Sequence, residues 1–268
     1  MSGTRVKSAL VFVPLLLLVS WLGGIVYFLF ILVMLGIGAW EYWRLLKTLG
    51  YDVSFPLMLA GVELLLVLRQ ISGFAATEWS LLAILLGSAI FSLVRYSKIE
   101  AQALLAFGLH VSGILYLGWL GGYFISLAAL PKGNWWVMVT FALVWMADLG
   151  GYIFGTKWGK HKMSLRLSPR KTWEGYLGGV IFGVGSGLLL SWLLRPVLPA
   201  LAIWEGALMG LVIALITPFG DLFISMLKRA AGVKDSGTLI PGHGGILDRA
   251  DTWLWAMMLG YYLVLAFA

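Results

Sequence analysis

Acidic and basic side chains gather in one segment near the carboxyl end of the chain. Positions 220–251 read GDLFISMLKRAAGVKDSGTLIPGHGGILDRAD. If a helix continues through the start of this segment, four polar residues spaced at i, i+4, i+7 and i+8 lie along one face: Asp221, Ser225, Lys228 and Arg229. A carboxylate followed two turns later by cations suits a metal ion with phosphate oxygens bound beside it.

The second half of the segment adds a flexible backbone and more oxygen ligands. Three glycines surround His243 and allow the backbone to approach a ligand closely. Asp248 and Asp251 are three residues apart, and Arg249 between them is a planar cation suited to phosphate. Separate carboxylate sites without Cys partners indicate Mg²⁺. The alternative is that these charges only neutralise one another in salt bridges, which explains neither the glycines nor two carboxylate sites.

A second basic segment, GTKWGKHKMSLRLSPRKTWEG at 155–175, carries six Lys and Arg residues and a Ser168–Pro169 turn. Cationic donors close to glycines resemble a surface for a polyphosphate. The alternative is a loop that only fixes the orientation of the neighbouring helices in the membrane.

Composition places both segments in a membrane protein. Of the 268 residues, 61% are hydrophobic and 12% are charged, which excludes a disordered chain and an ordinary soluble domain. The apolar runs are long enough to cross a bilayer, which takes about 20 residues each. We therefore predict an all-α polytopic membrane protein with about nine transmembrane helices. The absence of Cys excludes disulfides, thiolate metal sites and cysteine nucleophiles.

The basic residues predict the orientation of these spans. With nine spans, all but three of the 19 Lys and Arg residues fall on one face, the exceptions being Arg69, Lys132 and Arg195. Because basic residues in short loops stay in the cytoplasm, this asymmetry predicts a cytoplasmic N-terminus. We expect an N-terminal region of about five spans over 1–134. A C-terminal catalytic region over 135–268 would carry two cytoplasmic loops, at 155–175 and 225–251.

Two blocks of residues carry a resemblance to a known family. SMLKRAAGVKDSGTLIPGHGGILDRAD, from Ser225 to Asp251, resembles the signature of the phosphatidate cytidylyltransferases, also called CDP-diacylglycerol synthases. The block from Trp145 to Gly175, with its SP, KT and EG elements, is similar to the family's other cytoplasmic block. Two departures are Ile224, where many members have an acidic residue, and Ala250, where a larger apolar residue is usual.

The resemblance implies transfer of CMP from CTP to phosphatidic acid, giving CDP-diacylglycerol and pyrophosphate. It implies Mg²⁺, with a second cation such as K⁺ nearby, and a homodimer in the inner (cytoplasmic) membrane whose active site faces the cytoplasm; no nucleic-acid partner is expected. The implied metal ligands are Asp221, Asp248 and Asp251, and the implied catalytic residues are Asp221, Asp248, Lys228 and Arg249. The implied substrate-binding residues are Ser168, Lys171, Ser225, Arg229, Lys234, His243, Gly244 and Gly245.

Other readings of the sequence remain open at this point. A related membrane lipid nucleotidyltransferase or a lipid kinase would share much of the nucleotide-binding chemistry. An ion-coupled transporter would use Asp148 and Asp221 as ion sites, but the charges concentrate on one face instead of lining a path. Asp148 is a functional candidate because a carboxylate inside a span is costly. For Glu63 and His110 we expect packing or interhelical hydrogen bonds.

Overall fold

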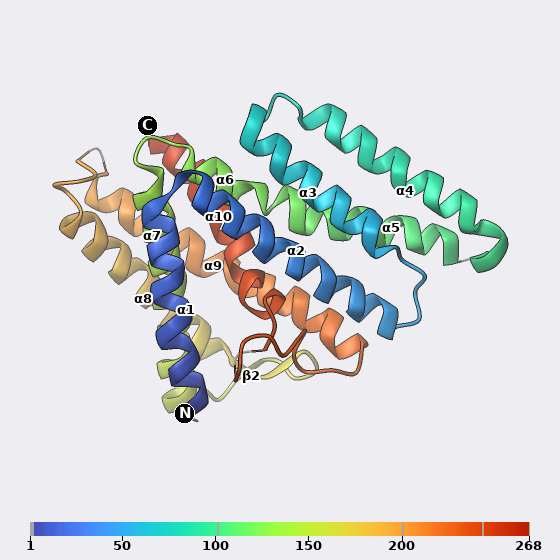
Figure 1. The fold of residues 1–268 in the computed structure, drawn as a ribbon. Helices are drawn as coiled ribbons and strands as arrows, with labels where there is room; N and C mark the ends of the chain where they lie inside the picture. Colours follow the sequence, from blue (N-terminus) through green and yellow to red (C-terminus); the bar gives the residue numbers. More distant parts are fainter. Residues whose placement is uncertain (1–2, 101, 200, 243, 268) are drawn as a thin grey trace. The chain divides into compact units, whose positions relative to one another are not determined.

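The computed structural model describes residues 3–100, 102–199, 201–242 and 244–267 (Figure 1). Within these ranges, eight helices are long and apolar enough to cross a membrane, and a shorter apolar stretch covers Leu10–Leu22. This confirms the predicted all-α polytopic membrane fold. Large apolar side chains lie on the surface, such as Leu104 at 78% exposed, as expected for helices that face lipid.

The helices follow one another with short connections. The first part of the chain forms α1 (Gly3–Leu22), α2 (Gly24–Thr48), α3 (Phe55–Ser72), α4 (Thr77–Ile99) and α5 (Gln102–Ile114). A π-helical turn (Leu115–Trp119) and α6 (Gly122–Ala128) follow. The second part forms α7 (Gly133–Trp158), β1 (Lys162–Ser164), β2 (Ser168–Thr172), α8 (Trp173–Leu193), α9 (Ile203–Ala230) and α10 (Leu247–Phe267).

Three local features complete this description. The apolar stretch Gln102–Ala128, which is long enough for one span, is divided into α5, the π-helical turn and α6. Helix α9 continues to Ala230, and α10 already begins at Leu247, so both helices extend into the charged segment. The basic segment forms a short antiparallel hairpin of β1 and β2, which the all-α prediction did not include.

The chain forms two compact units that are not contiguous in sequence. Unit 1 combines Met1–Ser126 with Leu227–Ala250, and unit 2 combines Leu127–Met226 with Asp251–Ala268. The charged segment is therefore divided, and most of it belongs with the N-terminal helices. The division after residue 134 that we expect from the sequence stays a prediction.

In unit 1, helices α2 to α5 lie side by side (Figure 1). Gly23 and Gly24 take positive φ angles where α1 ends and α2 begins, which glycine adopts without strain. At the α2–α3 loop, Asp52 accepts hydrogen bonds from Arg95 at 2.6 and 2.9 Å and from Lys47 at 3.3 Å. The Arg95 guanidinium lowers the pKa of the Asp52 carboxyl. Arg95 and Lys47 therefore anchor the α2–α3 loop, in addition to the role in span orientation that we expect for basic residues.

The two polar residues expected to have packing roles in unit 1 lie inside the helix bundle. His110 is fully buried, and its Nε2 accepts a hydrogen bond from the backbone N–H of Ser54 at 2.7 Å. Its Nδ1 lies 2.7 Å from the Ala106 carbonyl oxygen, so it donates there. The carboxylate of Glu63 lies against Gly36 of α2, where a Cβ would come 2.8 Å from Oε1. His110 thus joins α5 to the start of α3, as expected.

Glycines set the packing of unit 2. On α7, a Cβ at Gly150 would lie 2.5 Å from the Gly178 carbonyl oxygen of α8. Farther along α8, a Cβ at Gly183 would lie 2.7 Å from Ala214 of α9, and one at Gly187 would meet the Gly206 backbone. Small residues at these positions let the backbones touch, which is a common basis of helix association in membranes. Helix α8 is therefore held on two sides by α7 and α9.

We predict that Gly187→Leu strongly lowers the yield and thermal stability of folded protein, because its side chain would be forced against the α9 backbone. Gly185→Leu is the matched control: it lies two residues away on α8, and its Cβ would meet no described atom within 4 Å. Size-exclusion chromatography in detergent with a thermal ramp measures both variants. Equal stability of the two would contradict the close α8–α9 contact.

Candidate active site

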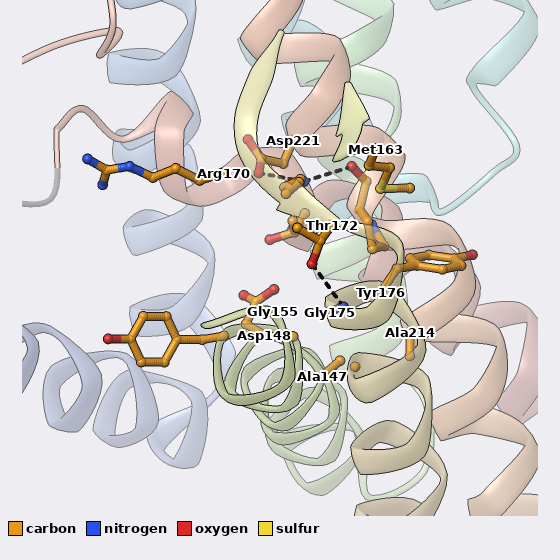
Figure 2. A pocket seen from close by; sticks show the side chains of 16 residues that line it. Ala147, Asp148, Gly155, Met163, Arg170, Thr172, Gly175, Tyr176, Ala214 and Asp221 are labelled. Atoms are coloured by element: carbon orange, nitrogen blue, oxygen red, sulfur yellow. Dashed lines mark hydrogen bonds and ion pairs between the residues drawn. The ribbon is translucent and has the colours of Figure 1, made fainter. Parts of the chain in front are cut away.

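Unit 2 contains a cavity of about 220 Å³ where α7, α8 and α9 meet the β-hairpin. Figure 2 shows Asp148 of α7, Thr172 of the hairpin and Asp221 of α9 around it. Gly151 and Gly155 of α7 and Gly175 and Gly179 of α8 form part of the wall, together with Lys171 and Tyr176. Because these glycines have no side chains, the cavity reaches the backbone, and carboxylates and cations face the same space.

The two charged segments expected to act together meet in this cavity. Lys171 Nζ lies 2.8 Å from Asp221 Oδ2 (Figure 2). Ser225 Oγ donates to Asp221 Oδ1 at 3.2 Å. Lys171 Nζ also donates to the Pro218 carbonyl oxygen at 3.2 Å. The side chains of Lys171 and Asp221 are 26% and 32% exposed, so solvent reaches both. This pair is therefore accessible to an ionic ligand.

Helix α9 is irregular beside the cavity. Pro218 lies within the helix and has no N–H, so it cannot donate the usual bond to the Ala214 carbonyl, and Ala214 lines the cavity. At the next residue, Tyr176 Oη donates to the Leu215 carbonyl oxygen at 2.9 Å. Non-helical hydrogen bonding at membrane depth is tolerated where protein or a cavity surrounds it. Side chains from α8 and the hairpin thus bind α9 carbonyls close to this position.

The hairpin is fixed to α8 at its base. Thr172 caps α8, with Oγ1 accepting from Gly175 N–H at 3.1 Å. Glu174 in the first turn of α8 accepts from the backbone N–H of Lys160 and His161, and its Oε1 lies 2.5 Å from His161 Nδ1. Lys171 and Arg170 of the hairpin both line the cavity. The end of the Arg170 side chain extends away from the other labelled side chains (Figure 2).

In unit 1, the segment between α9 and α10 is organised around Asp248. Asp248 is 8% exposed, and its Oδ1 lies 2.6 Å from Lys228 Nζ. Its Oδ2 accepts from Ser236 N–H at 2.7 Å, Ser236 Oγ at 3.0 Å and Gly245 N–H at 2.9 Å. Gly244 has a φ of +87°, which only glycine adopts readily. One carboxylate therefore holds the end of α9, the loop and the start of α10.

A second carboxylate reaches the same segment from α2. Glu41 is fully buried and accepts hydrogen bonds from Ser236 Oγ at 2.8 Å, Ile246 N–H at 3.0 Å and Leu247 N–H at 2.8 Å. One turn along α2, Arg44 donates to the Ser236 carbonyl oxygen at 2.9 Å. The sequence analysis assigned no role to Glu41 or Ser236 and counted Arg44 only among the basic residues that orient the spans. A glutamate inside an apolar run was the available signal, since a buried charge requires a partner.

The remaining expected site residues take the following positions. Asp251 in unit 2 is 4% exposed, and its Oδ1 accepts from Thr252 N–H at 2.7 Å. In unit 1, Arg249 is half-buried with no hydrogen-bond partner for Nε among the described residues, while Arg229 and Lys234 are exposed. Ser168 begins β2 and does not line the cavity. His243 lies outside the described residues.

The donors in the cavity fit a hard dication. Asp148 and Asp221 supply carboxylate oxygens there, and the chain has no Cys to favour a softer metal. Among the described residues, no group of three or more His, Asp or Glu side chains forms a complete metal cage. Mg²⁺ needs none, because it is bound through one or two carboxylates with substrate phosphates and water completing its shell.

Comparison with known proteins gives concordant matches. A sequence profile described as the cytidylyltransferase family matches residues 3–267. The chain is 32% identical to a phosphatidate cytidylyltransferase of Synechocystis, over 98% of this chain and 97% of that protein. It is 31% identical to one of Staphylococcus haemolyticus, over 96% and 95%, and 32% identical to one of Brucella suis, over 99% and 94%.

These matches cover both units, and so include the N-terminal helices for which the sequence motifs carried no resemblance. They favour nucleotidyl transfer over ion transport. With the cavity and its charged residues, they show that the chain belongs to the cytidylyltransferase family.

Proposed function

We propose that this integral membrane protein transfers CMP from CTP to phosphatidic acid, giving CDP-diacylglycerol and pyrophosphate. The observation that carries the proposal is the solvent-accessible Lys171–Asp221 pair in a cavity built by the basic hairpin and α9. Family membership and the names of the relatives supply the reaction class and the two substrates.

In the proposed reaction, a phosphate oxygen of the lipid attacks the α-phosphorus of CTP. A new phosphorus–oxygen bond forms to the lipid phosphate, and the bond from the α-phosphorus to the bridging oxygen of the β-phosphate breaks, so that pyrophosphate leaves with that electron pair. No covalent intermediate with the protein is needed. Positioning and neutralisation of charge therefore supply most of the catalysis.

The two lysine–carboxylate pairs suggest how the chain's own residues serve this step. Lys171 neutralises Asp221, and Lys228 neutralises Asp248. An incoming polyphosphate competes with each carboxylate for its lysine, because a phosphate accepts strong charge-assisted hydrogen bonds. The carboxylate released from its lysine then needs another cation. The salt bridges expected under the simpler interpretation are thus present. In this proposal, the substrate phosphate replaces the carboxylate as the partner of each lysine.

We further propose that Mg²⁺ is the cation the carboxylates receive. Asp221 and Asp148 would hold it in the cavity of unit 2, and Asp248 in unit 1 and Asp251 in unit 2 are each proposed as further ligands. When bound, Mg²⁺ neutralises charge developing on the phosphate oxygens. Lys171, Lys228 and Arg249 hold the phosphates, and Ser225 orients the Asp221 carboxylate through its hydrogen bond. The same proposal includes K⁺ as a second ion. It also includes substrate-binding roles for Ser168, Arg229, Lys234, His243, Gly244 and Gly245.

Purified protein incubated with CTP, Mg²⁺ and phosphatidic acid should release pyrophosphate and form a CDP-lipid, and a chelator should abolish both. ATP in place of CTP distinguishes a lipid kinase, which would release a nucleoside diphosphate and leave a newly phosphorylated lipid. If pyrophosphate forms only with a different lipid phosphate, the protein is instead a related lipid nucleotidyltransferase. Turnover unaffected by the chelator would contradict the Mg²⁺ proposal.

We predict that Lys171→Ala and Asp221→Asn each lower kcat by about 100-fold or more, because each removes a charge that faces the reacting phosphates. Lys162→Ala on the same hairpin is the matched control, since its side chain is exposed and outside the cavity lining. Lys47→Ala, which removes a surface partner of Asp52, provides a second control. Equal activity of all four variants would show that these charges serve only to orient the helices in the membrane.

The buried pair in unit 1 needs a different design. Removing one partner of a buried ion pair costs about 3–5 kcal/mol, so Asp248→Asn alone can lose activity by unfolding. We predict that Asp248→Asn combined with Lys228→Met regains thermal stability relative to Asp248→Asn, yet stays at least about 100-fold less active than the native protein. A stable and active double variant would remove both residues from the reaction.

Sidedness also belongs to the proposal. We infer that the N-terminus and both charged segments face the cytoplasm, where CTP is available, in the inner membrane. The support is the distribution of Lys and Arg along the chain. Since the native chain has no Cys, single cysteines report the side of each loop without background.

In intact cells, an impermeant thiol reagent should label cysteines at Ala75 and Pro131 but not at Lys162 and Thr238. All four positions are exposed, so burial does not explain a lack of labelling. Labelling at positions 162 and 238 after permeabilisation confirms that both cysteines are reactive. Labelling of either position in intact cells would refute the proposed orientation.

We retain a homodimer as part of this proposal, on the resemblance to the family. The mass of the purified protein in detergent or nanodiscs measures it directly, and a monomer with full activity would refute it.

A further inference from the structure

Glu41 holds three hydrogen-bond donors of the charged segment although it lies about 200 residues before them. The donors are Ser236 Oγ and the backbone N–H groups of Ile246 and Leu247, all within 3.0 Å. Leu247 is the first residue of α10, where backbone N–H groups have no partner within the helix. The Glu41 carboxylate therefore caps α10 from a different helix and adds negative charge at the positive end of its dipole.

The glycines of the segment fit around this carboxylate. A Cβ at Gly237 would meet Glu41 Oε1, and a Cβ at Gly245 would meet both oxygens of Glu41. Two of the glycines in this segment are thus explained by contact with Glu41. Arg44 adds a donor to the Ser236 carbonyl, so the end of α2 holds Ser236 by both its carbonyl and its hydroxyl.

Ser236 connects Glu41 to Asp248. Its hydroxyl oxygen lies 2.8 Å from Glu41 Oε2 and 3.0 Å from Asp248 Oδ2, and Ser236 is fully buried. A hydroxyl has one proton, so it donates to one carboxylate at a time. The two carboxylates compete for it, and a change at Glu41 alters what Asp248 receives. This coupling operates in a dry environment, where hydrogen bonds are strong and unpaired groups are costly.

We propose that Glu41 is a positioning residue of the nucleotidyl transfer: through Ser236 and the N-terminus of α10 it sets the place and hydrogen bonding of Asp248. The inference rests on the proposed function, because it assumes that Asp248 takes part in the reaction. Glu41 does not touch substrate, since it is fully buried beneath the segment that it holds. Its effect reaches the reaction only through the groups that it orients.

Glu41→Gln tests the proposal, because glutamine keeps the size but replaces one acceptor oxygen by an NH₂ group facing hydrogen-bond donors. We expect kcat per folded enzyme to fall about 10- to 100-fold, the usual cost of losing such a supporting partner, with a smaller change in KM for CTP. Hydrogen exchange should accelerate in peptides covering 235–247, whose amides Glu41 and Asp248 hold. A merely structural role would lower the folded yield and leave kcat per folded molecule unchanged.

Glu63→Gln is the matched control, because Glu63 is also a carboxylate within a helix of unit 1 but binds none of these donors. It should leave kcat and exchange over 235–247 unchanged. If Glu41→Gln does not fold, Ser236→Ala decides, because it removes only the hydroxyl that joins the two carboxylates. A fall in kcat of less than tenfold in folded Glu41→Gln, or in Ser236→Ala where that variant decides, overturns the inference.

Native protein and the Asp248→Asn, Lys228→Met double variant are assayed in parallel. Native protein that forms no CDP-lipid refutes the proposed function. A double variant as active as the native protein removes Asp248 from the reaction, and with it the route by which Glu41 would act. Normal native turnover with an inactive double variant and a fully active Glu41→Gln refutes only the role of Glu41.

Discussion

The low polarity of the membrane interior is the constraint on which the rest of this structure depends. A charge placed there is costly unless it is paired, and a backbone group there must be hydrogen-bonded within the protein. The same demands hold inside the protein, where buried carboxylates accept several donors at once. Asp248 accepts from a lysine, a hydroxyl and two backbone amides, and Glu41 accepts from a hydroxyl and two backbone amides. Each carboxylate thus binds hydrogen-bond donors of a non-helical segment that are buried inside the protein.

The same constraint links the packing of the helices to the chemistry of the cavity. Lipid gives little hydrophobic drive for helices to associate, so α7, α8 and α9 approach through glycines until their backbones touch. Some of these glycines also form the cavity wall, which leaves room beside Asp148 and Asp221. Pro218 interrupts the bonding of α9 at this level, and Lys171 and Tyr176 bind carbonyls there. The features that hold unit 2 together therefore also leave polar groups facing its cavity.

An ion pair between a lysine and a carboxylate can have two roles in such a site: it can neutralise buried charge, or it can exchange its partners for substrate and a cation. Taken alone, Lys171–Asp221 and Lys228–Asp248 are neutralised pairs, the simplest reading of a charged loop. Their exposure differs: the first pair is about a quarter to a third exposed, and the second is almost fully buried. A partly exposed pair can exchange its partners for a substrate phosphate and a cation at little cost. The buried pair also holds its folded segment together, so exchanging its partners costs more than at the exposed pair.

The sequence by itself determined the membrane class, the all-α fold and the family. Long apolar runs and the two motif blocks are local signals, readable without knowing what packs against them. Local spacing also placed Asp221 and Ser225 on one face, because α9 continues through them. Only the tertiary structure decided which distant residues meet: Lys171 with Asp221, and Glu41 with Ser236 and the start of α10. Glu41 lies in an apolar run nearly 200 residues before its partners, and nothing in its neighbours indicates them. Such pairings come from how non-adjacent helices pack, whereas composition and spacing record only what each segment does alone.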